Sequence, residues 1–169
     1  MQLAPSLASL LNRQLNNELQ ASYSYLAMSA WFETTAFPGF TQWMTLQSQE
    51  ETAHAMKFYQ YMNDRDCRVT LEAIEKPRTD FDSPLDVFRS SLAQEEKVTE
   101  QIHALYNAAE DARDHETKNF LNWFLGEQVE EEKTLRDMIE RLELVGDDPI
   151  GLLKMDEEAN ARIATPAEG

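Results

Sequence analysis

The sequence is poor in the residue types on which several fold classes depend. Its 169 residues include one cysteine, Cys67, together with five glycines and six prolines. A single cysteine forms no disulfide within the chain, so we expect a reducing compartment, the cytoplasm. The scarcity of glycine and proline argues against an all-β fold, because such folds need many tight turns.

Basic residues, long apolar runs and a targeting segment are also few or missing. Fifteen Lys and Arg stand against 31 Asp and Glu, which gives a formal net charge of −16. Nucleic-acid binding needs clustered Lys and Arg, so we expect no nucleic-acid partner. No apolar run approaches the ~20 residues of a membrane span, and residues 1–11 lack the basic and apolar stretches of a signal peptide. We therefore expect no membrane partner and a protein that attracts cations.

The chain does contain apolar residues at helical spacing. They make up 42% of the sequence, with eight Phe, five Tyr and three Trp, which excludes an acidic disordered tail. They recur at steps of three and four residues, the period of helices that bury one face. Breakers such as Pro38-Gly39 and Ser83-Pro84 separate the periodic segments. We predict a single domain over residues 1–169, with helices near 6–35, 39–66, 84–112, 115–145 and 149–162.

The lengths of the connections predict how these helices are arranged. The first and second helices are joined by a few residues, as are the third and fourth, so each pair is antiparallel. The 17 residues 67–83 show no helical period, and at ~3.3 Å per residue they reach roughly 55 Å. A helix of ~27 residues is only about 40 Å long. The expected fold class is therefore all-α: a four-helix bundle of two antiparallel hairpins joined by a long crossover, plus a short C-terminal fifth helix.

The two predicted hairpins look like copies of each other. A shift of 77 residues superposes polar residues near the middle of each hairpin: Glu18 on Glu95, Glu50 on Glu127, Glu51 on Gln128 and His54 on Glu131. These matches fall at one level along both hairpins. We interpret them as pseudo-twofold symmetry around a polar centre.

Each predicted buried face is apolar except near its middle, where ligand-type side chains interrupt it. These side chains are Glu18, Glu51, His54, Glu95 and Glu131, with Gln128 beside them. A buried carboxylate is unfavourable unless it is paired or binds a metal, and no Lys or Arg occupies these faces. Glu51-x-x-His54 puts a carboxylate and an imidazole one turn apart, as in the dinuclear sites of helical bundles. Such mixed ligands suit Fe, Mn or Zn, so we predict a two-metal site.

Several motifs carry a resemblance to a known family. They are Asn17-Glu18 with Tyr25 a heptad later, Glu50-Glu51-x-x-His54, Glu95, Asn119-Phe120-Leu121-x-Trp123, and Glu127-Gln128-x-Glu130-Glu131-Glu132-Lys133. Over essentially its whole length the chain resembles the non-haem ferritins of prokaryotic type. Bacterioferritins place a haem-ligand Met just after the first bridging Glu, whereas Thr52 stands there in this chain, so no haem is expected.

The resemblance implies iron storage and detoxification at a ferroxidase centre. In such proteins two Fe(II) ions are oxidised by O₂ or H₂O₂, and Fe(III) moves into a mineral inside a cage of 24 identical subunits. Glu18, Glu51 and His54 would hold the first iron, with Glu51 bridging to the second. The implied partners are thus Fe(II), the oxidant and further copies of the chain.

The same resemblance assigns roles on the other side of the centre. Glu95 and Glu131 would hold the second iron, and Gln128 would act by hydrogen bonding near it. Tyr25 matches the tyrosine that hydrogen-bonds at the centre and can donate an electron. Its alternative role is that of a packing aromatic with a satisfied hydroxyl.

A third iron site is also implied by the resemblance. Glu50, Glu127 and Glu130, with Glu131 shared, match the ligands that prokaryotic ferritins place towards the inner surface. The alternative is that these carboxylates are a solvated acidic face that holds no metal.

Two other functions remain open from the sequence. A small di-iron oxidase or peroxidase could have the same fold without forming a storage cage. A purely structural bundle would bind no metal at all. The size of the assembly separates the storage cage from the small oxidase, and aerobic addition of Fe(II) tests the metal-free bundle.

Overall fold

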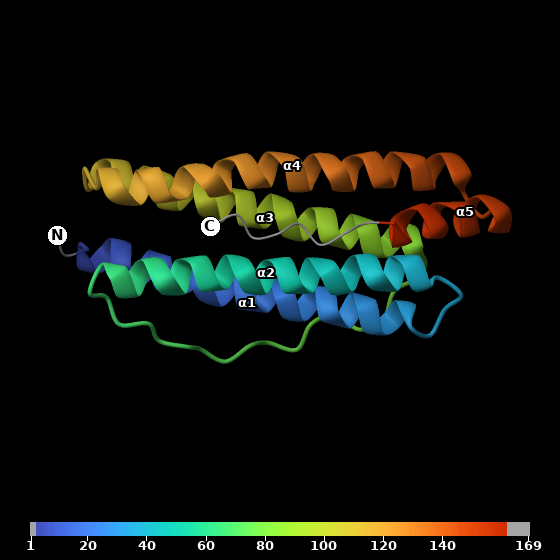
Figure 1. The fold of residues 1–169 in the computed structure, drawn as a ribbon, viewed down its shortest axis with the longest axis horizontal. Helices are drawn as coiled ribbons and strands as arrows, with labels where there is room; N and C mark the ends of the chain where they lie inside the picture. The colour runs from blue at the N-terminus through green and yellow to red at the C-terminus, as the bar shows by residue number, and fades with distance from the viewer. Residues whose placement is uncertain (1–2, 162–169) are drawn as a thin grey trace.

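The computed structural model describes residues 3–161, which contain helices and no strand. The helices are α1 (Pro5–Phe32), α2 (Pro38–Asp64), α3 (Pro84–Asp111), α4 (His115–Val145) and α5 (Pro149–Asn160). α1 packs against α2 and α3 against α4, so that two antiparallel hairpins form the bundle (Figure 1). α2 and α3 run in the same direction, because the connection between them returns along the whole bundle. The predicted all-α fold with its crossover and short fifth helix is confirmed.

The helices begin as predicted from their breakers and caps. Pro84 is the first residue of α3, and the side chain of Ser83 accepts a hydrogen bond from the backbone N–H of Asp86. Asp114 caps α4 and Asp148 caps α5 in the same way. A cap of this kind satisfies a backbone donor that the first turn of a helix leaves unpaired.

Two predicted helix ends were too late. The first helix ends at Phe32 rather than near residue 35, because the hydroxyls of Thr34 and Thr35 bond to the carbonyls of Trp31 and Phe32 and close a turn. The second ends at Asp64 rather than near residue 66, since Asp66 has a φ of 53° and cannot continue a right-handed helix. The predicted end of the last helix, residue 162, lies outside the described residues.

The crossover lies along α1 and is held there by side-chain amides. Asn12, Asn16 and Gln20 are spaced four residues apart on one face of α1. Their amide groups bond to backbone groups of Thr70, Glu72 and Glu75 at 2.8–3.1 Å, both donating and accepting. The segment is therefore fixed to the bundle without being helical itself.

α5 covers one end of the bundle by contacting the start of α2 (Figure 1). The buried carboxylate of Asp156 accepts a hydrogen bond of 2.7 Å from the backbone N–H of Phe40. At Gly39 the helices touch so closely that a Cβ atom would lie 1.8 Å from the backbone oxygen of Asp156. Only glycine permits this approach.

The apolar core consists of two clusters, one towards each end of the bundle. One cluster includes Phe32, Phe40 and Phe88, and the other includes Leu11 and Phe58. Between them lies a layer of buried polar side chains from all four long helices. Within residues 3–161, no helix has the length and hydropathy needed to cross a membrane.

Candidate metal centre

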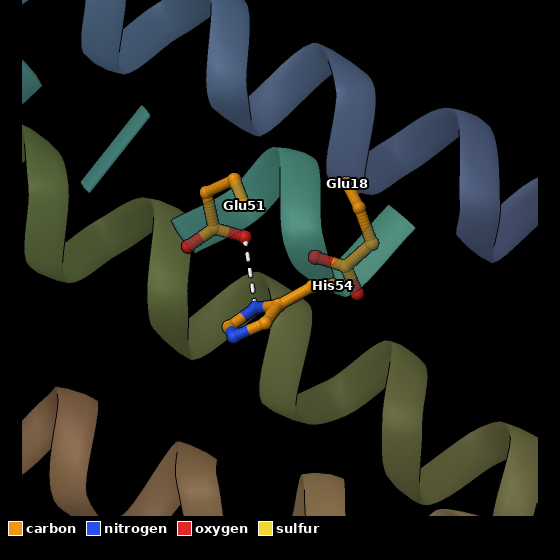
Figure 2. Close-up of side chains that lie close together, drawn as sticks. All are labelled: Glu18, Glu51 and His54. Atoms are coloured by element: carbon orange, nitrogen blue, oxygen red, sulfur yellow. Dashed lines mark ion pairs between the residues drawn. The ribbon is translucent and has the colours of Figure 1, made fainter. Parts of the chain in front are cut away.

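Three predicted ligands meet in the middle of the bundle. Glu18 comes from α1, and Glu51 and His54 lie one turn apart on α2 (Figure 2). Each offers a ligand atom, and these atoms all lie within 4.8 Å of one another. Nδ1 of His54 is 3.4 Å from Oε2 of Glu51. The exposed fractions of Glu18, Glu51 and His54 are 0%, 1% and 5%, so the group is shielded from solvent.

The electrostatics of this group fit a cation. Burial, followed by the charge of Glu51, raises the pKa of Glu18 well above its usual value. Burial also raises the pKa of Glu51, with a further contribution from Glu95. Among the described residues, no amide or hydroxyl group donates a hydrogen bond to Oε2 of Glu18 or to either carboxylate oxygen of Glu51, so at these oxygens the two acids have only each other and His54 as polar neighbours. Buried carboxylate oxygens without donors are unfavourable by themselves, and a metal ion supplies the missing interaction.

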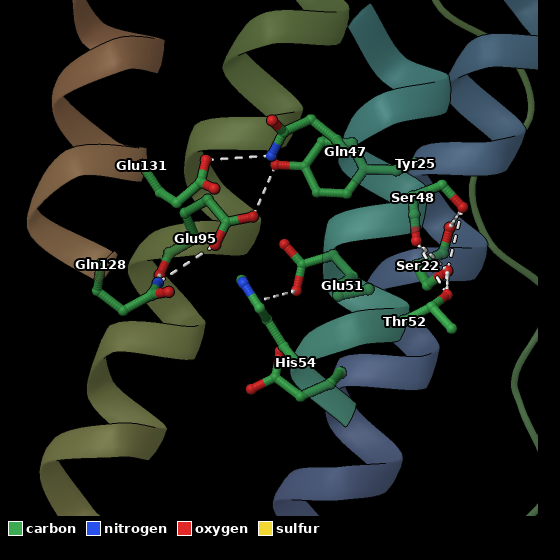
Figure 3. A network of polar contacts seen from close by, with 12 residues as sticks. Ser22, Tyr25, Gln47, Ser48, Glu51, Thr52, His54, Glu95, Gln128 and Glu131 are labelled. Atoms are coloured by element: carbon green, nitrogen blue, oxygen red, sulfur yellow. Dashed lines mark hydrogen bonds and ion pairs between the residues drawn. The ribbon is translucent and has the colours of Figure 1, made fainter. Parts of the chain in front are cut away.

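Glu95 lies on α3, across the centre from α2 (Figure 3). Its Oε1 accepts a hydrogen bond of 2.6 Å from the hydroxyl of Tyr25, and its Oε2 accepts one of 3.2 Å from the amide of Gln128. Burial raises the pKa of Glu95, while the bonds from Tyr25 and Gln128 lower it. Burial, and then the charge of Glu95, raise the pKa of Tyr25 well above 10.0, so the tyrosine is a hydrogen-bond donor at neutral pH. Both side chains therefore fix the orientation of Glu95.

Glu131 on α4 completes the polar layer. Its Oε2 accepts a hydrogen bond of 3.1 Å from the amide of Gln47 on α2, so that α2 and α4 are linked through the centre (Figure 3). The charges of Glu131 and Glu95 both raise the pKa of Glu51, which places these carboxylates near one another. The group of ligand atoms within 4.8 Å, as found among residues 3–161, does not include Glu95 or Glu131.

Glu50, Glu127 and Glu130 lie at the edge of the polar layer. Glu50 and Glu127 are half-buried, and Glu130 is exposed. Burial raises the pKa of Glu127, the charges of Glu130 and Glu50 raise it further, and His54 lowers it. In the described part of the chain these three carboxylates do not form a group with ligand atoms within 4.8 Å.

Two further residues contact the centre, the buried glutamines Gln14 and Gln47. Neither was predicted from the sequence to belong to it. Gln14 lies four residues before Glu18 and donates a hydrogen bond of 2.9 Å to its Oε1. Gln47 lies four residues before Glu51 but contacts Glu131. Their spacing of one helical turn from a ligand could have pointed to them, because residues four apart share a helix face.

A polar layer of carboxylates and one histidine inside a four-helix bundle is typical of the helical bundles that bind metal ions between their helices. A family model described as "Ferritin-like domain" matches residues 8–145. The chain is 39% identical over 160 residues to a "Bacterial non-heme ferritin" of Staphylococcus aureus, an alignment that covers 95% of this chain and 96% of that relative. A protein of the same name from Staphylococcus epidermidis is 40% identical over the same length. The chain belongs to the ferritin family.

Solved structures lead to the same conclusion. The open pore ferritin of the hyperthermophilic archaeon Archaeoglobus fulgidus has a TM-score of 0.95 at 40% identity, with 96% of this chain and 100% of that chain covered. A humanized archaeal ferritin has a TM-score of 0.96 at 39% identity, with 98% and 100% covered. The arrangement of the helices is thus that of the ferritins.

Proposed function

We propose that this protein stores and detoxifies iron, with Fe(II) as the substrate of a ferroxidase centre in each subunit. The observation that carries the proposal is the buried group of Glu18, Glu51 and His54, with carboxylate oxygens to which no amide or hydroxyl group among the described residues donates. The oxidant is O₂ or H₂O₂, and the product is Fe(III), which passes into a mineral inside a cage. Membership of the ferritin family supports the proposal.

The donor set suits two iron ions side by side. Glu18, Glu51 and His54 hold the first ion, and Glu95 and Glu131 hold the second, with Glu51 bridging between them. Each Fe(II) gives up one electron, so two ions supply the pair that reduces O₂ to H₂O₂ or H₂O₂ to water. Burial raises the pKa of Glu18 and of Glu51, so Fe(II) competes with protons for these carboxylates. Anionic oxygen ligands then favour Fe(III) over Fe(II).

Tyr25 and Gln128 act on the second ion through Glu95. Their hydrogen bonds to the two oxygens of Glu95 fix its orientation towards the centre. Tyr25 is fully buried and touches the ligand directly, which suits it to give an electron to the oxidation as well. Glu50, Glu127 and Glu130, with Glu131 shared, form a third iron site on the path from the centre.

Addition of Fe(II) to the protein in air tests the ferroxidase. Absorbance of ferric product in the near ultraviolet should rise much faster with the parent than with Glu51→Ala, by roughly 100-fold or more, because that variant loses the bridging carboxylate. A matched control is Glu96→Ala, since Glu96 is an exposed carboxylate beside Glu95 on α3. Equal rates for Glu51→Ala and the parent would show that the site assignment is wrong.

The cage is the part of the proposal that separates storage from a small di-iron oxidase or peroxidase. A cage of 24 chains of 19.5 kDa has a mass of about 470 kDa, whereas a dimer has about 39 kDa. Near α5 the side chains of Leu144, Ile150 and Leu153 are 85%, 78% and 48% exposed, which supports contact with other copies. Elution at the dimer mass in size-exclusion chromatography would favour the small oxidase.

We further propose that residues 1–169 form one domain and that the protein works in the cytoplasm. The single cysteine supports a reducing compartment. Fractionation of the source cells, with the protein detected by antibody, tests the compartment. Recovery in a secreted fraction would contradict it.

A further inference from the structure

Three buried glutamines each donate an amide N–H to a different carboxylate of the centre. The exposed fractions of Gln14, Gln47 and Gln128 are 2%, 1% and 3%. The pairs, with their distances, are Gln14 to Oε1 of Glu18 at 2.9 Å, Gln47 to Oε2 of Glu131 at 3.1 Å, and Gln128 to Oε2 of Glu95 at 3.2 Å. One amide therefore serves each of these three carboxylates, and each of the helices α1, α2 and α4 provides one.

Glu51 is the exception among the carboxylates. No amide donates to either of its oxygens among the described residues; Oε2 lies 3.4 Å from Nδ1 of His54, and the carboxyl group of Glu18 is its other polar neighbour. A carboxylate that no amide holds can turn to reach two metal ions, whereas one held by an amide keeps one orientation. This division fits a bridging role for Glu51 and a terminal role for the others.

The choice of an amide rather than a charged donor has a clear consequence. A Lys or Arg beside a carboxylate would neutralise it and compete with a metal ion for the same oxygens. A neutral amide holds one lone pair of the oxygen and leaves the negative charge for the cation. Gln14 and Gln47 are in this respect suited to metal ligands rather than to a salt bridge.

Packing alone does not account for Gln47. Its Oε1 is buried and has no partner among the described residues, which an apolar side chain of the same size would avoid. Gln14 is held in place from the other side, because Asn17 donates a hydrogen bond of 3.4 Å to its Oε1. That contact turns the amide nitrogen of Gln14 towards Glu18.

We propose that Gln14 and Gln47 are positioning residues of the metal centre, one for each ion. Gln14 orients Glu18 for the first ion, and Gln47 orients Glu131 for the second. The proposal rests on the two-ion centre of the proposed function. It predicts that removing either amide weakens one binding step and leaves the other unchanged.

Anaerobic titration with Co(II), followed by its visible absorption bands, tests the proposal without catalysis. The parent should bind two Co(II) ions per chain in two steps. Gln14→Met should weaken the first step by about tenfold, and Gln47→Met should weaken the second by about tenfold. Gln60→Met is the matched control, because Gln60 is an exposed residue of α2 that bonds only to Asp64. It should leave both steps at the values of the parent.

The outcomes distinguish a failure of the proposed function from a failure of the positioning roles alone. A parent chain that binds no Co(II) overturns the proposed function together with the positioning roles. Two steps in the parent, with both steps unchanged or equally weakened in Gln14→Met and Gln47→Met, overturn the positioning roles alone. Circular dichroism must show parental helix content for each variant. Gln14→Leu and Gln47→Leu replace any methionine variant that fails this check, and the same criteria apply to them.

Discussion

Tyr25 links α1 to α3 through a single hydroxyl, which donates to Oε1 of Glu95. Both side chains are almost completely buried, so solvent cannot replace this bond when it is lost. A hydrogen bond to a buried carboxylate contributes more to stability than an average one. We therefore expect the tyrosine to affect both the stability of the fold and the candidate metal centre.

Tyr25→Phe should reduce the free energy of unfolding by about 1–2 kcal/mol, because Glu95 loses one of its two side-chain donors. It should also slow the oxidation of Fe(II) several-fold. Guanidinium denaturation and ferric absorbance measure the two effects. Tyr23→Phe is the control, since Tyr23 is 45% exposed. If Tyr25→Phe and Tyr23→Phe had the same stability and the same oxidation rate, Tyr25 would have no role in the centre.

A second, partly buried contact lies at the end of the bundle where α2 meets α4. Arg65 donates two hydrogen bonds to Asp114, at 3.1 and 2.8 Å, and the side chains of both are 10% exposed. The guanidinium of Arg65 lowers the pKa of Asp114 from 3.8 to about 2. An acid whose pKa is lower in the folded state stabilises the fold above its ordinary pKa and ceases to do so as the pH falls through the lowered value.

The parent should therefore lose about 2 kcal/mol of stability from this pair as the pH falls from about 4 to about 2. Asp114→Asn should be less stable than the parent at pH 7, by about 2 kcal/mol, because Arg65 loses the charged partner that lowers the pKa of Asp114 and keeps neutral acceptors. The asparagine still caps α4, so the change isolates the ion pair. Urea denaturation at several pH values measures the free energy of unfolding of the parent and of Asp114→Asn. If the free energy of unfolding changed with pH in parallel for the two proteins, the prediction would be contradicted.

At the scale of the element, the docking of α5 depends on one glycine. A Cβ atom at Gly39 would overlap the backbone oxygen of Asp156, whereas a Cβ at Gly126 on α4 would meet nothing within 4 Å. The two positions make a matched pair. Both lie in helices, but only one lies against another helix.

Gly39→Ala should displace α5 and break the bond between Asp156 and the N–H of Phe40. Gly126→Ala should instead stabilise α4 by about 1 kcal/mol, because alanine favours a helix interior over glycine. Hydrogen exchange measured by mass spectrometry should show faster exchange in residues 149–160 for the first variant only. If α5 in Gly39→Ala were as well protected from hydrogen exchange as in the parent, the close approach of Gly39 to Asp156 would not be required for docking.

Helix starts, buried faces and the meeting of Glu18, Glu51 and His54 could be predicted, while most individual hydrogen bonds between helices could not. Pro84 after Ser83 marked a helix start because both residues favour the first turn. The bond between Gln47 and Glu131 joins residues 84 positions apart, and only the packing of α2 near α4 determines it. Glutamine is also common on solvated helix faces, so its type alone did not assign Gln47 to the centre.

At the scale of the whole molecule, the dominant property is charge. The chain has 31 acidic against 15 basic residues, and only a part of the acidic side chains lies in the buried centre. Within residues 3–161, most of the other acidic side chains are exposed or partly exposed, and they attract cations from solution. Salt screens such attraction, with a Debye length of about 8 Å at 0.15 M.

The rate of Fe(II) oxidation at low Fe(II) should therefore fall several-fold when NaCl is raised from about 10 mM to about 300 mM. Initial rates from ferric absorbance measure the effect. At saturating Fe(II), where capture of the ion no longer limits the rate, the same salt should have little influence. A salt effect of equal size at both Fe(II) concentrations would mean that the surface charge does not assist capture.

The amide contacts between α1 and the crossover have a consequence for the surface of the protein. Asn12, Asn16 and Gln20 bond to backbone atoms of the crossover and to none of its side chains. The attachment is thus independent of which side chains the segment carries, as long as its N–H groups remain. Leu71 and Ile74, which are 66% and 45% exposed, supply none of these backbone groups, so their side chains can be exchanged without breaking the attachment. The exposed side chains of the crossover can therefore change, in evolution or by design, while the bundle beneath them stays the same.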